Sequence, residues 1–166
     1  MLRDCEVTGL LRVFGGQYTR GHKSFLKGHL MAARKTAGKA ISSPPDRADD
    51  FARTFYALKQ IFAPYENRLH VTADSREKYY LETTSRSYNG RPLFFGAAIR
   101  GRAYVSFHLM PLYWDASLLK GISPELQKRM QGKSCFNFTA PDPALFRELA
   151  KIAARGFALY RRKNLL

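Results

Sequence analysis

Polar side chains of types that do chemistry recur on two segments in the second half of the chain. Segment 102–110 alternates apolar and polar residues, which predicts a strand whose polar side chains point to one face. On that strand the polar face carries Tyr104, Ser106 and His108. Segment 134–138 alternates in the same way, with Cys135 and Asn137 opposite its two phenylalanines. If the two strands are neighbours, a thiol, an imidazole and a carboxamide meet on one sheet face.

A thiol beside an imidazole has three interpretations. It can be an activated nucleophile. It can bind a soft metal, but such a site needs three or four ligands, and His108 and Cys135 are at most two. It can also be a small buried thiol beside a packed histidine. We therefore predict no catalytic residue, no metal site and no cofactor, and we interpret the surface as a candidate ligand-binding face. The candidate binding residues are Tyr104, His108, Trp114 (beside an expected cavity), Lys133, Cys135 and Asn137.

The elements that must position these residues follow from periodicity and from proline and glycine. Apolar residues spaced 4, 3, 4 predict a first helix after Asp49 or Asp50, with the buried face Phe51, Phe55, Leu58 and Phe62. Asp142-Pro143 opens a last helix, whose buried face is Leu145, Leu149, Ile152, Gly156 and Tyr160. A short helix is expected from Pro124 to Met130, with Gly132 as its C-terminal stop.

Five strands are predicted between these helices, at 69–73, 78–84, 93–99, 102–110 and 134–138, with a tight hairpin at Arg100-Gly101. The predicted order is α-β-β-β-β-α-β-α, without the alternating βαβ units of a parallel sheet. We therefore predict an α+β fold with two layers, in which an antiparallel sheet of about five strands has the N- and C-terminal helices packed on one face.

Residues 1–48 differ in character from the rest. Any helical period there is interrupted by Gly15-Gly16, Gly21, Gly28 and Gly38, and Ser42-Ser43-Pro44-Pro45 ends the region. We predict a disordered basic extension over 1–48, followed by a single α+β domain over 49–163. The extension can be a transit peptide, a nucleic-acid-binding arm, or untranslated sequence ahead of a true start at Met31.

The chain of 166 residues is strongly basic, with a net charge of +15. Residues 49–166 hold nineteen Lys/Arg against ten Asp/Glu, a net charge of +9. This charge favours an anionic partner or a solvated basic surface. The longest apolar run, 93–99, is too short to span a bilayer. Cys5 and Cys135 lie far apart in the sequence, which indicates a reduced, cytoplasmic protein rather than a disulfide framework.

Aromatic and charged residues on the predicted sheet suggest further possibilities. Tyrosines interleave with arginines and can stack bases between phosphate contacts; the tyrosines are Tyr65, Tyr79, Tyr80, Tyr88 and Tyr104. His70 and His108 can approach each other, although two histidines are a weak metal site. The acidic residues Asp74, Glu77 and Glu82 surround a turn and are expected to be solvated.

From Leu93 to about Tyr160 the sequence resembles the YdhG-like family of small bacterial domains of unknown function. The residues that carry the resemblance are Phe94-Phe-Gly-Ala-Ala98, Val105-Ser-Phe-His-Leu109, Leu118-Leu119, Gly132-Lys133, Phe136-Asn-Phe138 and the helix through Leu145, Leu149 and Ile152. The resemblance implies a frataxin-like fold. Some members are described as iron chaperones, and frataxin-like iron binding uses a row of acidic side chains. Here the first helix region offers only Asp49, Asp50 and the distant Glu66, so the sequence departs from that pattern.

These observations together predict a small, cytoplasmic, non-enzymatic binding domain that uses the open face of its sheet. Its partner is a ligand, another protein or a second copy of the chain, and no membrane is involved. Two alternatives stay open: nucleic-acid binding through a basic Tyr/Arg-rich surface, and frataxin-like iron delivery.

Overall fold

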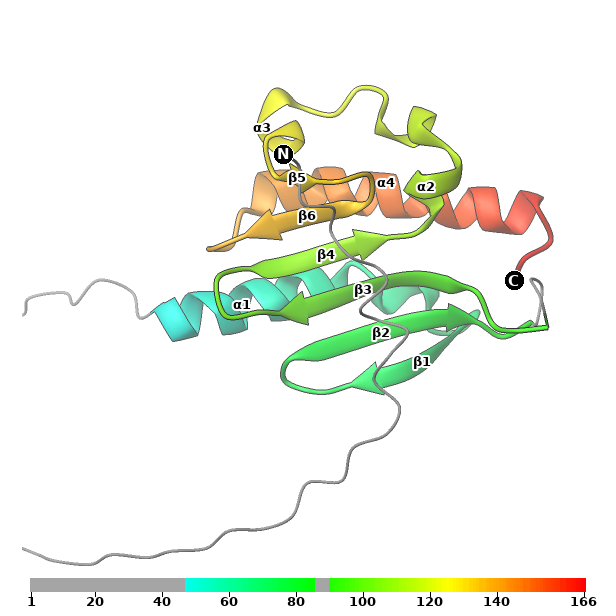
Figure 1. Ribbon diagram of the computed structural model, residues 1–166, viewed down its shortest axis with the longest axis horizontal. Helices are drawn as coiled ribbons and strands as arrows, with labels where there is room; N and C mark the ends of the chain where they lie inside the picture. Colours follow the sequence, from blue (N-terminus) through cyan, green and yellow to red (C-terminus); the bar gives the residue numbers. More distant parts are fainter. Residues whose placement is uncertain (1–46, 86–89) are drawn as a thin grey trace, which may run out of the picture. The chain divides into compact units, whose positions relative to one another are not determined.

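The computed structural model describes residues 47–85 and 90–166. The expectations for residues 1–46, Met31 and Cys5 among them, and for Tyr88 lie outside this part. In chain order its elements are α1 (Arg47–Gln60), η2 (Ala63–Tyr65), β1 (Leu69–Asp74), β2 (Lys78–Thr83), β3 (Phe94–Arg100), β4 (Val105–Leu109), α2 (Pro111–Trp114), η3 (Ala116–Leu119), α3 (Pro124–Gln127), β5 (Met130–Gln131), β6 (Cys135–Phe138) and α4 (Pro143–Arg162). The strands form one antiparallel sheet in the order β1-β2-β3-β4-β6-β5 (Figure 1).

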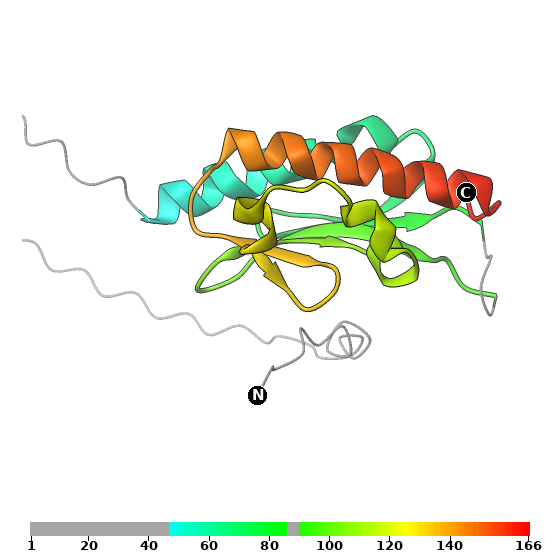
Figure 2. The same cartoon turned by 90° about the horizontal axis from the view of Figure 1, so that it is seen from above.

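The predicted fold class is confirmed. The sheet is antiparallel throughout the described residues, and α1 and α4 lie on the same side of it (Figure 2). Every apolar position predicted for these two helices is buried. Asp142 caps α4 as expected, because its carboxylate accepts a hydrogen bond from the Leu145 amide at 3.1 Å. No helix in the described part of the chain is long and apolar enough to cross a membrane.

The short helix before the last strand is a partial error of the sequence analysis. Ser123 caps α3 as predicted, but the helix ends at Gln127. The backbone then turns extended, and Met130 and Gln131 pair with β6 as a sixth strand. Gly132 has a positive φ of 68° between β5 and β6, so it belongs to a hairpin turn and is not a helix stop.

The strand predicted over 102–110 is also shorter in the structure, where β4 begins at Val105. The Gly101 amide donates to the Tyr104 carbonyl at 2.9 Å and closes a wider connection than a two-residue hairpin. Tyr104 therefore lies in the turn, 39% exposed, and not on the strand face where the sequence analysis placed it.

The register of the sheet defines its two faces, because directly paired residues share a face. Phe107 pairs with Ala98 and Phe136, and it stacks on Phe62 from the segment that follows α1. We call the face that carries Phe107 the helix side. The opposite face, which carries His108 and its partners Ala97 and Cys135, is called the outer face.

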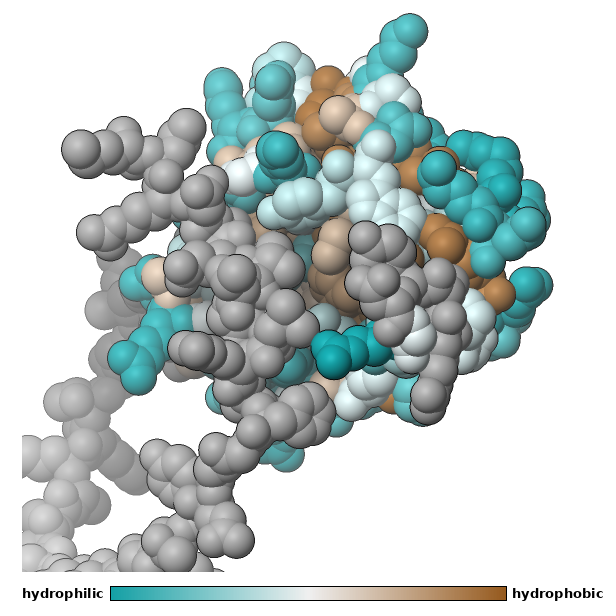
Figure 3. All heavy atoms as spheres, turned by 45° about the vertical axis from the view of Figure 1, so that its right-hand side comes forward, coloured by the Kyte–Doolittle hydropathy of each residue, from teal (hydrophilic) through white to brown (hydrophobic). Residues whose placement is uncertain are grey.

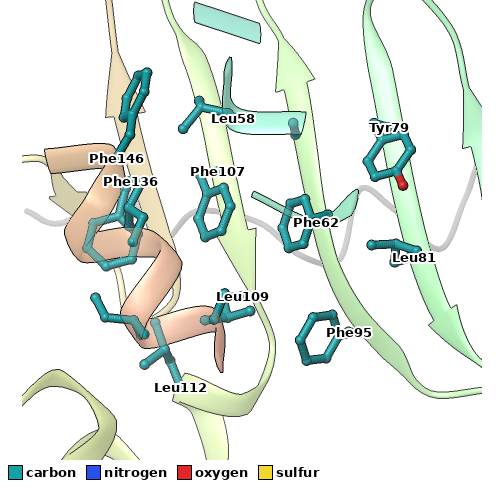
Figure 4. Packing of buried hydrophobic residues seen from close by; sticks show 14 of the residues in the cluster. Leu58, Phe62, Tyr79, Leu81, Phe95, Phe107, Leu109, Leu112, Phe136 and Phe146 are labelled. Atoms are coloured by element: carbon teal, nitrogen blue, oxygen red, sulfur yellow. The ribbon is translucent and has the colours of Figure 1, made fainter. Parts of the chain in front are cut away.

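The Phe62 ring lies among three other aromatic rings on the helix side (Figure 4). It stacks on Phe107 with ring centroids 4.7 Å apart, and it also contacts Tyr79 and Phe95 at 6.2 Å each. The ring fits because Gly96 has no side chain. A Cβ at Gly96 would lie 2.6 and 2.7 Å from Phe62 ring carbons.

A β-bulge turns Phe95 toward the helix side. Leu81 pairs with Gly96 and Glu82 pairs with Phe94, so Phe95 is an extra residue in β3. Its ring contacts Phe157 and Tyr160 of α4 at centroid distances of 6.0 and 5.4 Å. The bulge thus links β3 to α4 and to the Phe62 ring in the segment that follows α1.

Gly96→Ala is expected to destabilise the fold by about 1–3 kcal/mol, because the new methyl group overlaps Phe62 and approaches the His108 carbonyl to 2.8 Å. Urea denaturation of the full chain measures the change. Adding Phe62→Leu should recover part of the loss relative to the sum of the two single variants, since only the ring overlap is relieved. A Gly96→Ala protein as stable as the wild type would contradict this packing.

Candidate functional site

Neighbouring strands β4 and β6 bring together the residues that alternation placed on one face. Ser106 pairs with Asn137, and His108 pairs with Cys135. The expectation that these four side chains share the outer face holds in the structure. Three of them, Ser106, His108 and Cys135, are buried, at 7%, 8% and 1% exposure, and Asn137 is half-buried.

A chain of hydrogen bonds crosses β4, β6 and β5 on this face. The Ser106 hydroxyl donates to Asn137 Oδ1 at 2.9 Å, and Asn137 Nδ2 donates to Gln131 Oε1 at 2.6 Å. Sequence reasoning missed Gln131, because it assigned this region to the end of a helix. Its only signal was a polar side chain immediately before Gly132. The network uses both the oxygen and the nitrogen of the Asn137 amide, which fixes the orientation of that side chain, and it uses the oxygen of the Gln131 amide.

His108 and Cys135 form the second contact of this face. Cys135 Sγ lies 2.8 Å from His108 Nδ1. Burial lowers the pKa of His108 to about 4, because the charged imidazolium loses its hydration there. The ring is therefore neutral at physiological pH and accepts the thiol hydrogen at Nδ1 when its own proton is on Nε2. A base this weak does little to activate a thiol.

The far end of the outer face, on β1 and β2, carries charges of both signs. His70 of β1 pairs with Glu82 of β2. Lys78 lies on the same face of β2, two residues before Tyr80. Burial raises the pKa of Glu82, and the charges of His70 and Lys78 partly offset that rise. Glu82 is half-buried, whereas the sequence analysis expected a solvated carboxylate.

The other two acids of that expected solvated set differ from each other. Glu77 is exposed as expected. Asp74 is also exposed, but both of its oxygens accept hydrogen bonds from Lys59 Nζ, at 2.6 and 2.7 Å. Asp74 therefore belongs to an ion pair on the helix side.

Aromatic and aliphatic side chains occupy the middle of the outer face. The rings of Tyr80 and Phe94 stack with centroids 4.4 Å apart, and Lys78 Nζ lies 5.0 Å from the Tyr80 ring centroid. Burial and the nearby Glu82 carboxylate raise the pKa of Tyr80 to about 12. Ala97 and Ile99 continue this middle region along β3.

Three candidate residues do not join the group. Tyr104 lies in the β3–β4 turn, and Lys133 is exposed in the β5–β6 turn. Trp114 stacks on Tyr160 of α4 with centroids 5.4 Å apart, so it lies on the helix side. The expected cavity is present beside it, as a hollow of about 530 Å³ lined by Leu93, Met110, Trp114, Lys163 and Leu165.

The remaining sequence alternatives find less support in the described residues. His70 and His108 share the outer face, but β2 and β3 separate their strands, which places them roughly 14 Å apart. No group of three potential metal ligands occurs in 47–85 and 90–166. Tyr79 is buried on the helix side, where its hydroxyl donates to Glu66 at 2.5 Å, and Tyr65 stacks on Phe157. In the described part of the tyrosine set, only Tyr80 remains on the outer face.

The lowered pKa of His108 predicts acid sensitivity. Above pH 6.5 the ring is neutral in both the folded and unfolded chain, and between 6.5 and about 4 only the unfolded chain takes up the proton. Stability should therefore fall as the pH falls through this window, by about 3 kcal/mol in total. Denaturation of wild type and His108→Gln at several pH values measures it, since the variant should lack this part of the decline. Equal slopes for the two proteins would contradict the prediction.

Comparison with known proteins gives no match to this chain among protein-family models, curated proteins or solved structures. The resemblance to the YdhG-like family consequently rests on the residues quoted from the sequence. The chemistry of the outer face is the remaining basis for a functional proposal.

Proposed function

We propose that this chain is a small, non-enzymatic binding domain of the YdhG-like type, and that it contacts its partner through the outer face of the sheet. The observation that carries the proposal is an apolar centre between two polar borders. We call this centre the apolar strip, and it consists of Tyr80, Phe94, Ala97 and Ile99. Protein interfaces are built in this way, with an apolar core and a polar rim.

The apolar strip can supply binding energy. Three of its side chains, Tyr80, Phe94 and Ile99, are half-buried and retain apolar surface that a partner can cover. Covering such surface contributes roughly 25 cal/mol per Å² before the costs of association. Figure 3 shows that, on the part of the surface it leaves visible, hydrophobic residues in brown are interspersed with hydrophilic residues in teal.

The borders of the strip suggest which partner fits. One border holds Lys78 and Glu82, which carry opposite charges, together with His70. The other is the Ser106–Asn137–Gln131 network, whose amides and hydroxyl both donate and accept. A surface with both signs of charge and both kinds of hydrogen-bonding group can complement itself across a two-fold axis. A second copy of the chain is therefore the partner we propose.

The His108–Cys135 pair supports a binding role over a catalytic one. A neutral imidazole with a pKa of about 4 is a poor general base near pH 7, and the Cys135 thiol is buried. The pair is better suited to joining β4 to β6 beneath the binding surface.

Ile99→Glu is expected to convert a dimer of the full chain into a monomer, because it places a charge in the middle of the apolar strip. Sedimentation velocity across a concentration series measures the association. Ala154→Glu is the matched control, since it adds the same charge at an exposed position of α4 and should leave the dimer intact. A wild type that stays monomeric at every concentration, or a dimer that survives Ile99→Glu, would contradict the proposed self-association.

A further inference from the structure

A second hollow lies on the other side of the sheet, between α1 and the β1–β2 turn. It has a volume of about 470 Å³, within the range of small-molecule sites. Its charged lining residues are three cations and one carboxylate, namely Lys59, Arg76, Arg100 and Asp74. The hollow has no part in the outer face, because Lys59 belongs to α1 and Asp74 pairs with Tyr79 on the helix side.

The single carboxylate neutralises only one of these cations. Asp74 binds Lys59 Nζ through both oxygens, and Lys59 also lies 4.9 Å from the centroid of the Tyr79 ring. Lys59 is thus held in place with its charge balanced. Two guanidinium groups remain in the hollow without an acidic partner among the described residues.

The two arginines differ in how they are held. The Arg100 guanidinium donates one hydrogen bond to the Ala48 carbonyl at 3.3 Å, which directs the side chain across the start of α1 and leaves further N–H donors. Arg76 makes no hydrogen bond or ion pair with any described residue. Two guanidinium groups line one hollow, and a phosphate is a ligand that accepts paired N–H donors from such groups.

An aromatic side chain completes the hollow. Tyr56 lines it and is 64% exposed, so its ring has a face available to a ligand. We propose that this hollow binds a nucleoside monophosphate unit, with the phosphate between Arg76 and Arg100 and the base against Tyr56. Stacking of a base on an aromatic ring adds affinity with little sequence preference.

Adenosine 5′-monophosphate is the probe that tests the site, in an NMR titration of the full chain. We expect saturable shifts of amides in the second half of α1 and in the β1–β2 turn. Inorganic phosphate should compete at the same amides, and adenosine should bind more weakly than the monophosphate. A single-stranded oligonucleotide distinguishes the source, because tighter binding than the monophosphate at the same amides would identify a nucleic-acid strand. Absence of saturable shifts, or shifts scattered over the basic surface, would overturn the proposal.

Arg76→Ala is the decisive variant, because this side chain is exposed and takes part in neither of the ion pairs among the described residues. Loss of one charged hydrogen-bonding group should weaken binding of the monophosphate about ten-fold. Lys151→Ala is the matched control, since it removes one positive charge from an exposed position on α4 and should leave the affinity unchanged. Equal affinities of the two variants would refute a site at Arg76. Ile99→Glu should bind adenosine 5′-monophosphate with the affinity of the wild type. The test of this hollow is therefore independent of the test of the outer face.

Discussion

The position of the Phe62 ring above Gly96 is the constraint on which the rest of this fold depends. Phe62 stacks on Phe107 of β4 and touches Phe95 of β3 and Tyr79 of β2, so one side chain connects the segment after α1 to three strands. Any side chain at position 96 would displace it. Aromatic pairs of this kind add stability beyond the area they bury. The bulge at Phe95 extends the same packing to α4.

Packing on the helix side determines what the outer face can offer. Because side chains alternate along a strand, each bulky ring directed to the helices leaves its neighbours on the opposite face. On β4 those neighbours are Ser106 and His108, and on β6 they are Cys135 and Asn137. They bond with one another, which leaves the β2–β3 region, with its stacked Tyr80 and Phe94, as the apolar part of the face. On β4 and β6, the phenylalanine rings that pack in the core thus lie on the helix side, and the side chains that form hydrogen bonds lie on the outer face.

Periodicity in the sequence was sufficient to predict much of this arrangement. The 4, 3, 4 spacing in α1 and α4 identified their buried faces, and the period of two in β4 and β6 placed His108 beside Cys135. These patterns are reliable because backbone geometry sets both periods. The sequence predicted this shared face on the condition that β4 and β6 are neighbours in the sheet, and the structure shows that they are.

The features that escaped sequence analysis depend on pairing between distant segments. Met130 and Gln131 carry no strand signal of their own and become β5 only because β6 offers free backbone groups. The bulge at Phe95 lies in a wholly apolar run, where alternation cannot show which residue is extra. Tyr104 continued an alternating pattern beyond the point where the chain turns. Hence Gln131 was missed and Tyr104 was misplaced.

The assignment of self-association to the apolar strip can be tested most directly by cross-linking. The Ile99→Cys variant of the full chain and, as a control, the Ala154→Cys variant would each be treated with a short bis-maleimide. Both variants keep the native cysteines, so any cross-linking through those cysteines is common to the two. We predict a covalent dimer with cysteine at 99 and little product with cysteine at 154. Equal cross-linking at the two positions, or none at 99, would contradict a partner copy on the outer face.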